Sequence, residues 1–320
     1  MTSVHVPGTP VLSGVRMHLH TPPSPAQGTV VSTARCTASP KAAGVIRHIT
    51  FDVSGTQLAG NIRPGQSFGV LAPGKDERGL PHKLRLYSVS SPTAGEDGQG
   101  NVIATTVKRL IDEHHDTHRL FLGVASNYLC DLAVGDKVQL TGPSGKRFVL
   151  PADPSAHDYL FFATGTGIAP FRGMLMDLYS RPGPGAPRSV LLLGSPYASD
   201  LPYDRQFREL AAAQPGFRYL PTLSRERRPD GQPGLYVQDQ LTLRREEFSA
   251  LLGSERTLIY VCGIAGMELG IFQAIWRLPE DVRRQYLDVD PQFAGDSRDW
   301  TRKLISKEVR HTRRVFLEVY

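Results

Sequence analysis

The chain has 320 residues, of which 40% are hydrophobic and 21% charged, and its formal net charge is +6. These values are typical of a soluble globular protein with two domains, and they exclude a disordered or fibrous chain. There is no apolar run of about 18 residues and no long Lys/Arg run, which argues against a membrane span and against nucleic-acid binding.

The N-terminal residues 1–28 are predicted to form a flexible or loosely docked tail, because they are rich in Pro, Gly and Thr. They lack the pattern of a secretory signal. The cysteines Cys36, Cys130 and Cys262 lie far apart and have no iron–sulfur or zinc spacing. A reducing compartment is therefore favoured, and we expect a cytoplasmic protein.

Residues 29–152 are predicted to form an antiparallel Greek-key β-barrel. Short β-like runs recur there at close intervals, separated by turn clusters such as Ala94–Gly98. The expected strands are Gly28–Thr33, Ile46–Val53, Ser67–Leu71, Leu84–Ser90, Asn101–Lys108, Gly123–Ser126 and Lys137–Thr141.

Residues 153–320 are predicted to form a doubly wound α/β domain with a parallel sheet, because continuous apolar strands alternate with helices. The expected strands are Tyr159–Ala163, Val190–Leu193, Phe217–Leu223 and Thr257–Cys262, and the expected helices are Pro170–Tyr179, Asp204–Ala213, Val237–Leu252 and Gly266–Leu278. A helix over Asp299–Val309 and a strand over Arg313–Tyr320 complete the prediction.

The strand around residue 87 carries three groups that suit a flavin dinucleotide. Arg85 can pair with a pyrophosphate, Tyr87 can stack on a planar ring, and Ser88 can hydrogen-bond a ring nitrogen. The alternative is an ordinary half-buried strand that begins with an arginine.

A glycine-rich turn, Ala163–Pro170, follows the first strand of the second domain and opens a helix. Glycines allow a phosphate to approach the backbone, and a helix N-terminus favours negative charge. Residues Gly123–Ser126 offer a second cradle of this kind. In each case a purely structural turn is the alternative.

Polar groups follow other strands of the second domain. Ser224 and Arg225, with Tyr236 nearby, suit a 2′-phosphorylated adenosine, since arginine recognises phosphate through a rigid fork. Cys262 ends another strand, where buried packing is a commoner role than chemistry.

The histidines at 114, 115 and 118 could form a metal site, but a polar loop between two strands is favoured, and no metal is predicted.

The ordered set of motifs resembles the plant-type ferredoxin–NADP(+) reductases from about residue 29 to 320. The motifs that carry the resemblance are Arg63–Ser67, Arg85–Ser88, Gly123–Cys130, Thr141–Pro143, Gly165–Pro170, Ser224–Arg225, Tyr260–Gly263 and Glu318–Tyr320. The resemblance implies an FAD-binding barrel followed by an NADP-binding α/β domain. It implies a flavoenzyme that exchanges electrons between NADP(H) and a one-electron carrier, a separate acidic ferredoxin or flavodoxin.

The resemblance also implies roles for single residues. FAD would be bound by Arg85, Tyr87, Ser88, Thr106, Lys108, Gly123, Val124, Ala125, Ser126 and Tyr320. NADP(H) would be bound by Thr166, Gly194, Ser195, Ser224, Arg225, Tyr236, Gln238, Gly263 and Met267. Ser88, Cys262, Glu318 and Tyr320 would be catalytic, and Tyr87 and Tyr320 would cover the two faces of the flavin ring.

Three positions depart from the family pattern. Asp112 stands where many members have an aromatic residue for the FAD adenine, and Ala125 replaces a cysteine. Gly234 replaces a lysine for the 2′-phosphate, for which Arg227 or Arg228 can substitute.

Two other functions stay open. The loop Pro73–Gly79 and the segment Gly123–Asp131 are similar to the reductase component of benzoyl-CoA oxygenase systems, so the chain could feed an oxygenase. A flavin- or nucleotide-binding protein without catalysis is the third function considered.

Overall fold

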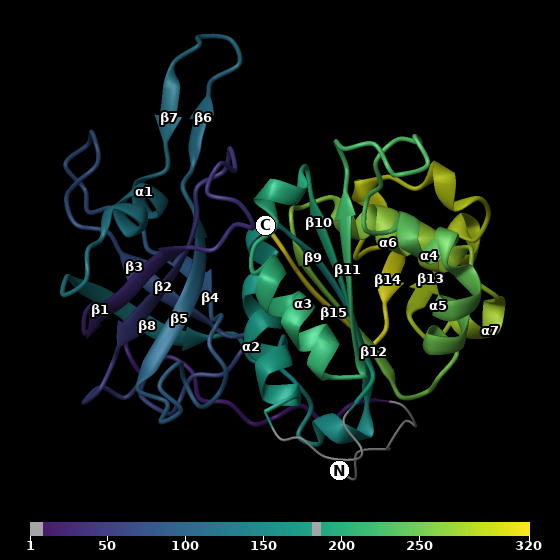
Figure 1. Ribbon diagram of the computed structural model, residues 1–320, viewed down its shortest axis with the longest axis horizontal. Helices are drawn as coiled ribbons and strands as arrows, with labels where there is room; N and C mark the ends of the chain where they lie inside the picture. The colour runs from purple at the N-terminus through teal and green to yellow at the C-terminus, as the bar shows by residue number, and fades with distance from the viewer. Residues whose placement is uncertain (1–8, 181–186) are drawn as a thin grey trace.

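The computed structural model describes residues 9–180 and 187–320, which fold into two packed domains (Figure 1). The first domain contains β1 (Ala26–Arg35), β2 (Ile46–Asp52), β3 (Ser67–Leu71), β4 (Arg85–Ser88), β5 (Val102–Lys108), β6 (Ile111–Glu113), β7 (Leu120–Leu122), α1 (Val124–Asp131) and β8 (Lys137–Ser144).

Six of these strands form an antiparallel sheet in the order β4-β3-β8-β1-β2-β5. A bridge between Val89 and Thr105, and a hydrogen bond from the Ser90 N–H to the Ala104 carbonyl, join the two outer strands and close the sheet. Phe51 and Phe68 lie fully buried inside it with their rings 5.8 Å apart. The predicted antiparallel barrel is confirmed.

Two expectations for the first domain are wrong. Gly123–Ser126 is not a strand, because α1 begins at Val124 and buries Leu129 and Cys130 in the barrel core. The tail over residues 1–28 is predicted to be flexible or loosely docked; its residues 9–25 are not flexible but docked along the barrel, with the His20 N–H donating to the Gly142 carbonyl and the Gln66 amide donating to the Arg16 carbonyl. Residues 1–8 of that tail lie outside the described residues.

The second domain contains β9 (Asp158–Thr164), α2 (Ile168–Leu178), β10 (Ser189–Ser195), α3 (Asp204–Ala213), β11 (Phe217–Leu223), α4 (Asp239–Leu243), α5 (Arg245–Leu252), β12 (Thr257–Gly263), α6 (Met267–Trp276), α7 (Glu280–Arg283), β13 (Leu287–Val289), β14 (Val309–His311) and β15 (Val315–Val319). Its main sheet has the order β11-β10-β9-β12-β15, and all the pairs are parallel.

Helices cover both faces of this parallel sheet (Figure 1). Side chains alternate along β9, so that Leu160 and Phe162 enter the core under α4, α5 and α6, while Phe161 enters the core under α2 and α3. The predicted doubly wound α/β domain is therefore confirmed. The strands of the first sheet end at Ser144 and those of the second begin at Asp158, on either side of the expected boundary at residue 152.

Two helix predictions in the second domain need correction. The expected helix Val237–Leu252 is divided into α4 and α5 at Arg244, whose φ of −115° and ψ of 41° are not helical. The expected helix Asp299–Val309 is instead two 3₁₀ turns, Ser297–Asp299 and Arg302–Leu304, followed by β14, which pairs with β13. Ser306 has a φ of 67°, which an α-helix cannot contain.

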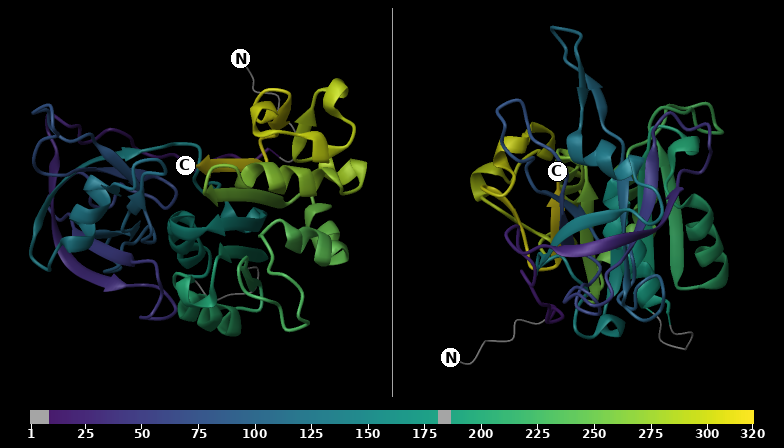
Figure 2. Two further views of the ribbon diagram at one scale, coloured as in Figure 1. Left: turned by 90° about the horizontal axis from the view of Figure 1, so that it is seen from above. Right: turned by 90° about the vertical axis from the view of Figure 1, so that its left-hand side faces the viewer.

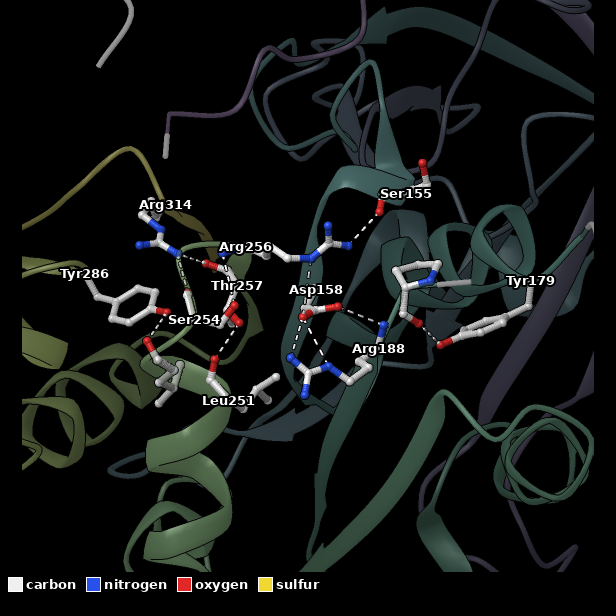
Figure 3. A network of polar contacts seen from close by, with 12 residues as sticks. Ser155, Asp158, Tyr179, Arg188, Leu251, Ser254, Arg256, Thr257, Tyr286 and Arg314 are labelled. Atoms are coloured by element: carbon white, nitrogen blue, oxygen red, sulfur yellow. Dashed lines mark hydrogen bonds and ion pairs between the residues drawn. The ribbon is translucent and has the colours of Figure 1, made fainter. Parts of the chain in front are cut away.

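An ion-pair network fixes the starting edge of the parallel sheet (Figure 3). Asp158 begins β9 and is 3% exposed, and its carboxylate accepts from the backbone and guanidinium of Arg188 at 2.8–3.2 Å. Arg256 lies 3.8 Å from the same carboxylate and donates to the Ser155 carbonyl. This edge is opposite to the carboxyl ends of the strands, so the network is structural.

Buried polar contacts also join the two domains. Arg172 of α2 is 8% exposed and forms a bidentate ion pair with Glu96 of the barrel. Tyr203, which precedes α3, shares its hydroxyl with His48 Nδ1 at 2.9 Å and with Thr106 Oγ1 at 2.6 Å. Burial and the charge of Arg172 lower the pKa of His48 to about 3, so this histidine is neutral. The contacts hold the domains in one orientation.

No helix within residues 9–180 and 187–320 has the length and apolar character that crossing a membrane requires.

Candidate functional site

A cavity of about 860 Å³ opens between the two domains. The barrel contributes β4, β5, the β6–β7 hairpin and the start of α1, and the α/β domain contributes the turn after β9 and the end of β15. The C-terminus therefore lies between the domains, as Figure 1 shows. The cavity includes all ten residues expected to bind FAD: Arg85, Tyr87, Ser88, Thr106, Lys108, Gly123, Val124, Ala125, Ser126 and Tyr320.

Strand β4 forms one wall of the cavity. It pairs with β3, so that Tyr87 lies opposite Phe68 and Ser88 opposite Ser67. The Thr105 hydroxyl donates to the Ser88 carbonyl at 2.7 Å and holds the end of the strand. Tyr87 packs partly against the barrel core, and burial raises its pKa to about 12, so its hydroxyl stays protonated. Arg85 at the start of the strand is exposed at the cavity.

The start of α1 forms a second wall. Gly123 is the N-cap of the helix and has no side chain to cap it, so no side chain among the described residues caps the first-turn N–H groups, which can bind an anion. A Cβ on Gly123 would lie 2.6 Å from Ser126 Oγ and 2.9 Å from Leu110 Cβ, so only glycine fits this close approach. The Ser126 hydroxyl donates to the Gly123 carbonyl at 3.1 Å and tightens the turn.

Strand β5 contributes Thr106 and Lys108. Lys108 is exposed, whereas Thr106 is 4% exposed and its hydroxyl is bound to Tyr203 on the other side of the barrel wall. The Thr106 hydroxyl is therefore engaged at the domain interface.

The end of β15 brings two of the expected catalytic residues, Glu318 and Tyr320, to the cavity. Tyr320 is 61% exposed, and its hydroxyl lies 2.6 Å from Thr166 Oγ1, so Thr166 also lies at this cavity. Cys262 lies opposite Glu318 in the pairing of β12 with β15. Cys262 is fully buried and does not line the cavity, and burial, with a smaller effect of Glu318, raises the pKa of its thiol well above 9.

Glu318 carries an unpartnered oxygen. Its Oε2 atom is buried and accepts no hydrogen bond from the residues the structure describes. Burial raises the pKa of this carboxyl from 4.5 to about 7. A carboxyl of this kind can hold or release a proton near neutral pH, directly beside the cavity.

The other residues expected to bind NADP(H) gather at the carboxyl ends of the parallel strands and do not line this cavity. The Ser224 N–H donates to the Ser195 carbonyl at 3.0 Å, which joins the turns after β10 and β11. Gly263 has a φ of 151°, and a Cβ there would lie 2.1 Å from Thr164 Oγ1, which itself donates to Met267 Sδ. These turns are therefore packed closely against each other.

Tyr236 and Gln238 differ in exposure. Tyr236 is 65% exposed, and its ring is free to cover a planar group. The Gln238 amide faces Gly270 of α6, where an added Cβ would come within 2.9 Å of it. Gln238 therefore packs against the α6 helix, while Tyr236 stands on the surface.

The arginines of the loop after β11 are used differently. Arg227 donates to the Gly231 carbonyl at 2.8 Å, and Arg228 donates to Pro233 and pairs with Asp230. Arg225 is exposed, and its guanidinium has no hydrogen bond or ion pair with the described residues. Arg225 is thus the most available of the three for a phosphate.

Gly234 could not carry a lysine without a backbone shift. A Cβ there would lie 2.4 Å from the Leu223 carbonyl oxygen.

Residues that the motifs did not indicate also line the cavity, among them Leu110, Phe121, His82 and Lys83. Phe121 belongs to the β6–β7 hairpin, which projects from the body of the barrel (Figure 2). The apolar run Leu120–Leu122 after the polar turn 114–119 is a sequence signal for a strand here, although it does not indicate which of the three side chains faces the cavity.

The histidines of this turn lie at the hairpin tip. His118 pairs with Glu113 at 2.6 Å and His115 with Asp116 at 3.1 Å. Across residues 9–180 and 187–320, no group of His, Cys, Asp and Glu side chains could hold a metal ion.

Comparison with known proteins agrees with this arrangement. Residues 161–272 match the oxidoreductase NAD-binding domain. The chain is 38% identical over 266 residues to a chloroplastic leaf ferredoxin–NADP reductase of Oryza sativa subsp. indica, which covers 81% of this chain and 71% of that protein. It is 35% identical to the ferredoxin–NADP reductase of Thermosynechococcus vestitus, with 82% and 68% covered.

Solved structures of the ferredoxin–NADP+ reductase from Plasmodium falciparum share the fold. One has a TM-score of 0.69 at 21% identity and covers 95% of this chain and 99% of that one. Another, with 2′P-AMP, has a TM-score of 0.68 at 19% identity and the same coverage. On the sequence identity to the rice and cyanobacterial proteins, the chain belongs to the plant-type ferredoxin–NADP reductase family.

Proposed function

We propose that this chain is a ferredoxin–NADP(+) reductase, which exchanges electrons between NADP(H) and a one-electron carrier such as ferredoxin or flavodoxin by way of FAD. The observation that carries the proposal is the cavity between the domains, which is lined by every side chain expected to hold FAD. The cavity lies next to the carboxyl ends of the parallel strands, which is where nucleotides bind in open α/β folds.

The residues of the cavity fit FAD. The first-turn N–H groups of α1 and the guanidinium of Arg85 suit a pyrophosphate. Tyr87 and Tyr320 are aromatic side chains from opposite domains that face the same cavity, which suits a planar ring between them. FAD, when bound, can take a pair of electrons from NADPH and pass them on singly.

Tyr320 controls access to the place where the nicotinamide would lie. Its ring is exposed, and a single hydrogen bond to Thr166 is the contact that its hydroxyl makes with the described residues. Movement of the ring therefore requires little loss of contact. The Glu318 carboxyl and Ser88, which both line the cavity, would then orient the nicotinamide and hold a proton there.

NADP(H) specificity is assigned to the surface after β11. Ser224, Arg225 and Tyr236 provide a hydroxyl, an available guanidinium and an uncovered ring. This set suits an adenosine with a 2′-phosphate, the group present in the 2′P-AMP of the Plasmodium structure.

The carrier would dock at the mouth of the cavity. Lys83 and Lys108 are exposed there, and the chain has a net charge of +6. An acidic carrier would be steered to this mouth by electrostatic attraction, at a rate that falls as salt is added.

The test is steady-state turnover of the purified FAD-loaded protein with NADPH or NADH and a panel of acceptors: ferricyanide, several ferredoxins, a flavodoxin and oxygenase-type iron–sulfur proteins. Efficient NADPH turnover with ferredoxin or flavodoxin supports the proposal. A strong preference for an oxygenase-type acceptor would assign the chain to an oxygenase system. No ferricyanide reduction would contradict any reductase function.

A further inference from the structure

The β6–β7 hairpin turns one aromatic side chain toward the proposed FAD cavity. In its register Asp112 lies opposite Phe121, and Glu113 lies opposite Leu120. Neighbouring strand residues point to opposite faces, so Phe121 and Asp112 share one face while Leu120 and Leu122 lie on the other. Phe121 lines the cavity and the two leucines do not.

The Phe121 ring is largely uncovered. It is 59% exposed, and it stands beside Leu110 and Val124, which are 43% and 48% exposed and line the same cavity. An apolar surface of this kind at the wall of a ligand cavity suits a flat, weakly polar group.

The base of the hairpin is held firmly against α1. The Gly123 N–H donates to the Leu110 carbonyl at 3.0 Å, and the Leu110 N–H donates to Ser126 Oγ at 3.2 Å. The Asn127 amide donates to the Leu110 carbonyl at 2.9 Å. Phe121 precedes Gly123 by two residues, so its position is fixed within about 7 Å of the proposed pyrophosphate cradle.

We propose that Phe121 stacks on the adenine ring of FAD. This inference rests on the proposed function, which places the flavin ring between Tyr87 and Tyr320 and the pyrophosphate at Arg85 and the start of α1. In FAD the adenosine lies across the pyrophosphate from the flavin. The cavity lining includes three apolar side chains from the hairpin and the start of α1: Leu110, Phe121 and Val124.

The pairing of Asp112 with Phe121 explains why this chain does not need an aromatic residue at position 112. The Cβ atoms of directly opposed residues in an antiparallel pair are about 4.5–5.5 Å apart. An aromatic residue at either position 112 or position 121 can therefore reach the same base. This chain has the ring on β7 and a carboxylate on β6.

The experiment compares FAD with FMN, which lacks the adenosine. Dissociation constants are measured for wild type, Phe121→Ala, Phe121→Trp and Leu120→Ala, from flavin released on dilution of FAD- or FMN-loaded protein. Leu120 is the matched control, because it is 71% exposed on the other face of the same hairpin. Base–aromatic stacking predicts a rise of about tenfold or more in the FAD constant of Phe121→Ala. The FMN constant of this variant should stay unchanged, and Phe121→Trp and Leu120→Ala should bind both flavins like wild type.

A double variant tests the exchange between strands. Asp112→Tyr in the Phe121→Ala background is expected to recover FAD affinity and leave FMN affinity unchanged, and no recovery would overturn the assignment of both positions to one base. The stacking role itself is overturned if Phe121→Ala binds FAD like wild type, or if it weakens FAD and FMN equally. Failure of the wild-type protein to bind either flavin would instead refute the proposed function.

Discussion

Glu318 makes the stability of this protein depend on pH in an unusual direction. Burial raises the pKa of its carboxyl from 4.5 to about 7, so the folded protein favours the protonated form. The stabilisation that Glu318 contributes is complete below pH 4.5 and is lost as the pH rises through 7. Replacement by glutamine keeps the shape of the neutral carboxyl and removes its ionisation.

The size of the effect follows from the pKa. A rise from 4.5 to about 7 corresponds to ~3 kcal/mol, at 1.36 kcal/mol for each pKa unit. At pH 8.5 Glu318→Gln should therefore be more stable than wild type by up to ~3 kcal/mol, or about 4 °C in Tm for a chain of this length. At pH 4.5, where only half ionisation of the unfolded chain separates them, the two proteins should differ by about 0.4 kcal/mol, or less than about 1 °C in Tm.

The assay is thermal unfolding of FAD-loaded wild type and Glu318→Gln across this pH range, without NADP(H). Glu246→Gln, on the exposed face of α5, is the control and should leave the pH dependence unchanged. The reasoning is refuted if Glu318→Gln and wild type keep the same difference in Tm at pH 4.5 and pH 8.5.

Two further variants test residues of the proposed site, and two test buried ion pairs that stabilise the fold. Arg225→Ala should raise KM for NADPH about tenfold or more, through loss of charge-assisted hydrogen bonds to phosphate, and leave KM for NADH unchanged; equal losses for both nucleotides would contradict the 2′-phosphate role. Tyr320→Ser should lower the dissociation constant of NADP(+), which titration by difference spectra measures. If the Tyr320 ring occupies the nicotinamide position in about nine-tenths of the wild-type molecules, the expected decrease is about tenfold. Glu96→Ala leaves the buried Arg172 guanidinium unpaired and should lower the free energy of unfolding by ~3 kcal/mol, measured by urea denaturation. Asp158→Asn should cost ~2 kcal/mol in the same assay without changing KM for NADPH, because Asp158 lies at the starting edge of the sheet; a raised KM would place it in the site.

The sequence predicts the parts of the site that are local in the chain. Arg85, Tyr87 and Ser88 are neighbours on one strand, and the turns at Gly123 and Gly165 carry their own signal in their glycines. Tyr320 could be joined to this strand through the order of the motifs, although almost the whole chain separates the two.

Cross-strand and core contacts could not be predicted in this way. Phe121 reaches the cavity only through its pairing with Asp112, which no motif records. The expected helix over Asp299–Val309 is absent because Trp300 packs on Trp276 while Val309 pairs with Val289. Trp300 and Val309 are both buried, but the backbone between them turns at Ser306 and is not helical.

The bond between Tyr203 and Thr106 has a consequence for how this family can be recombined. The Thr106 hydroxyl belongs to the barrel wall beside the proposed FAD cavity, yet the α/β domain supplies its partner. A chimera that joins this barrel to the α/β domain of a relative would keep His48, Glu96 and Thr106 but could lack their partners Tyr203 and Arg172. The buried contacts between the domains are therefore kept only if both domains are exchanged together.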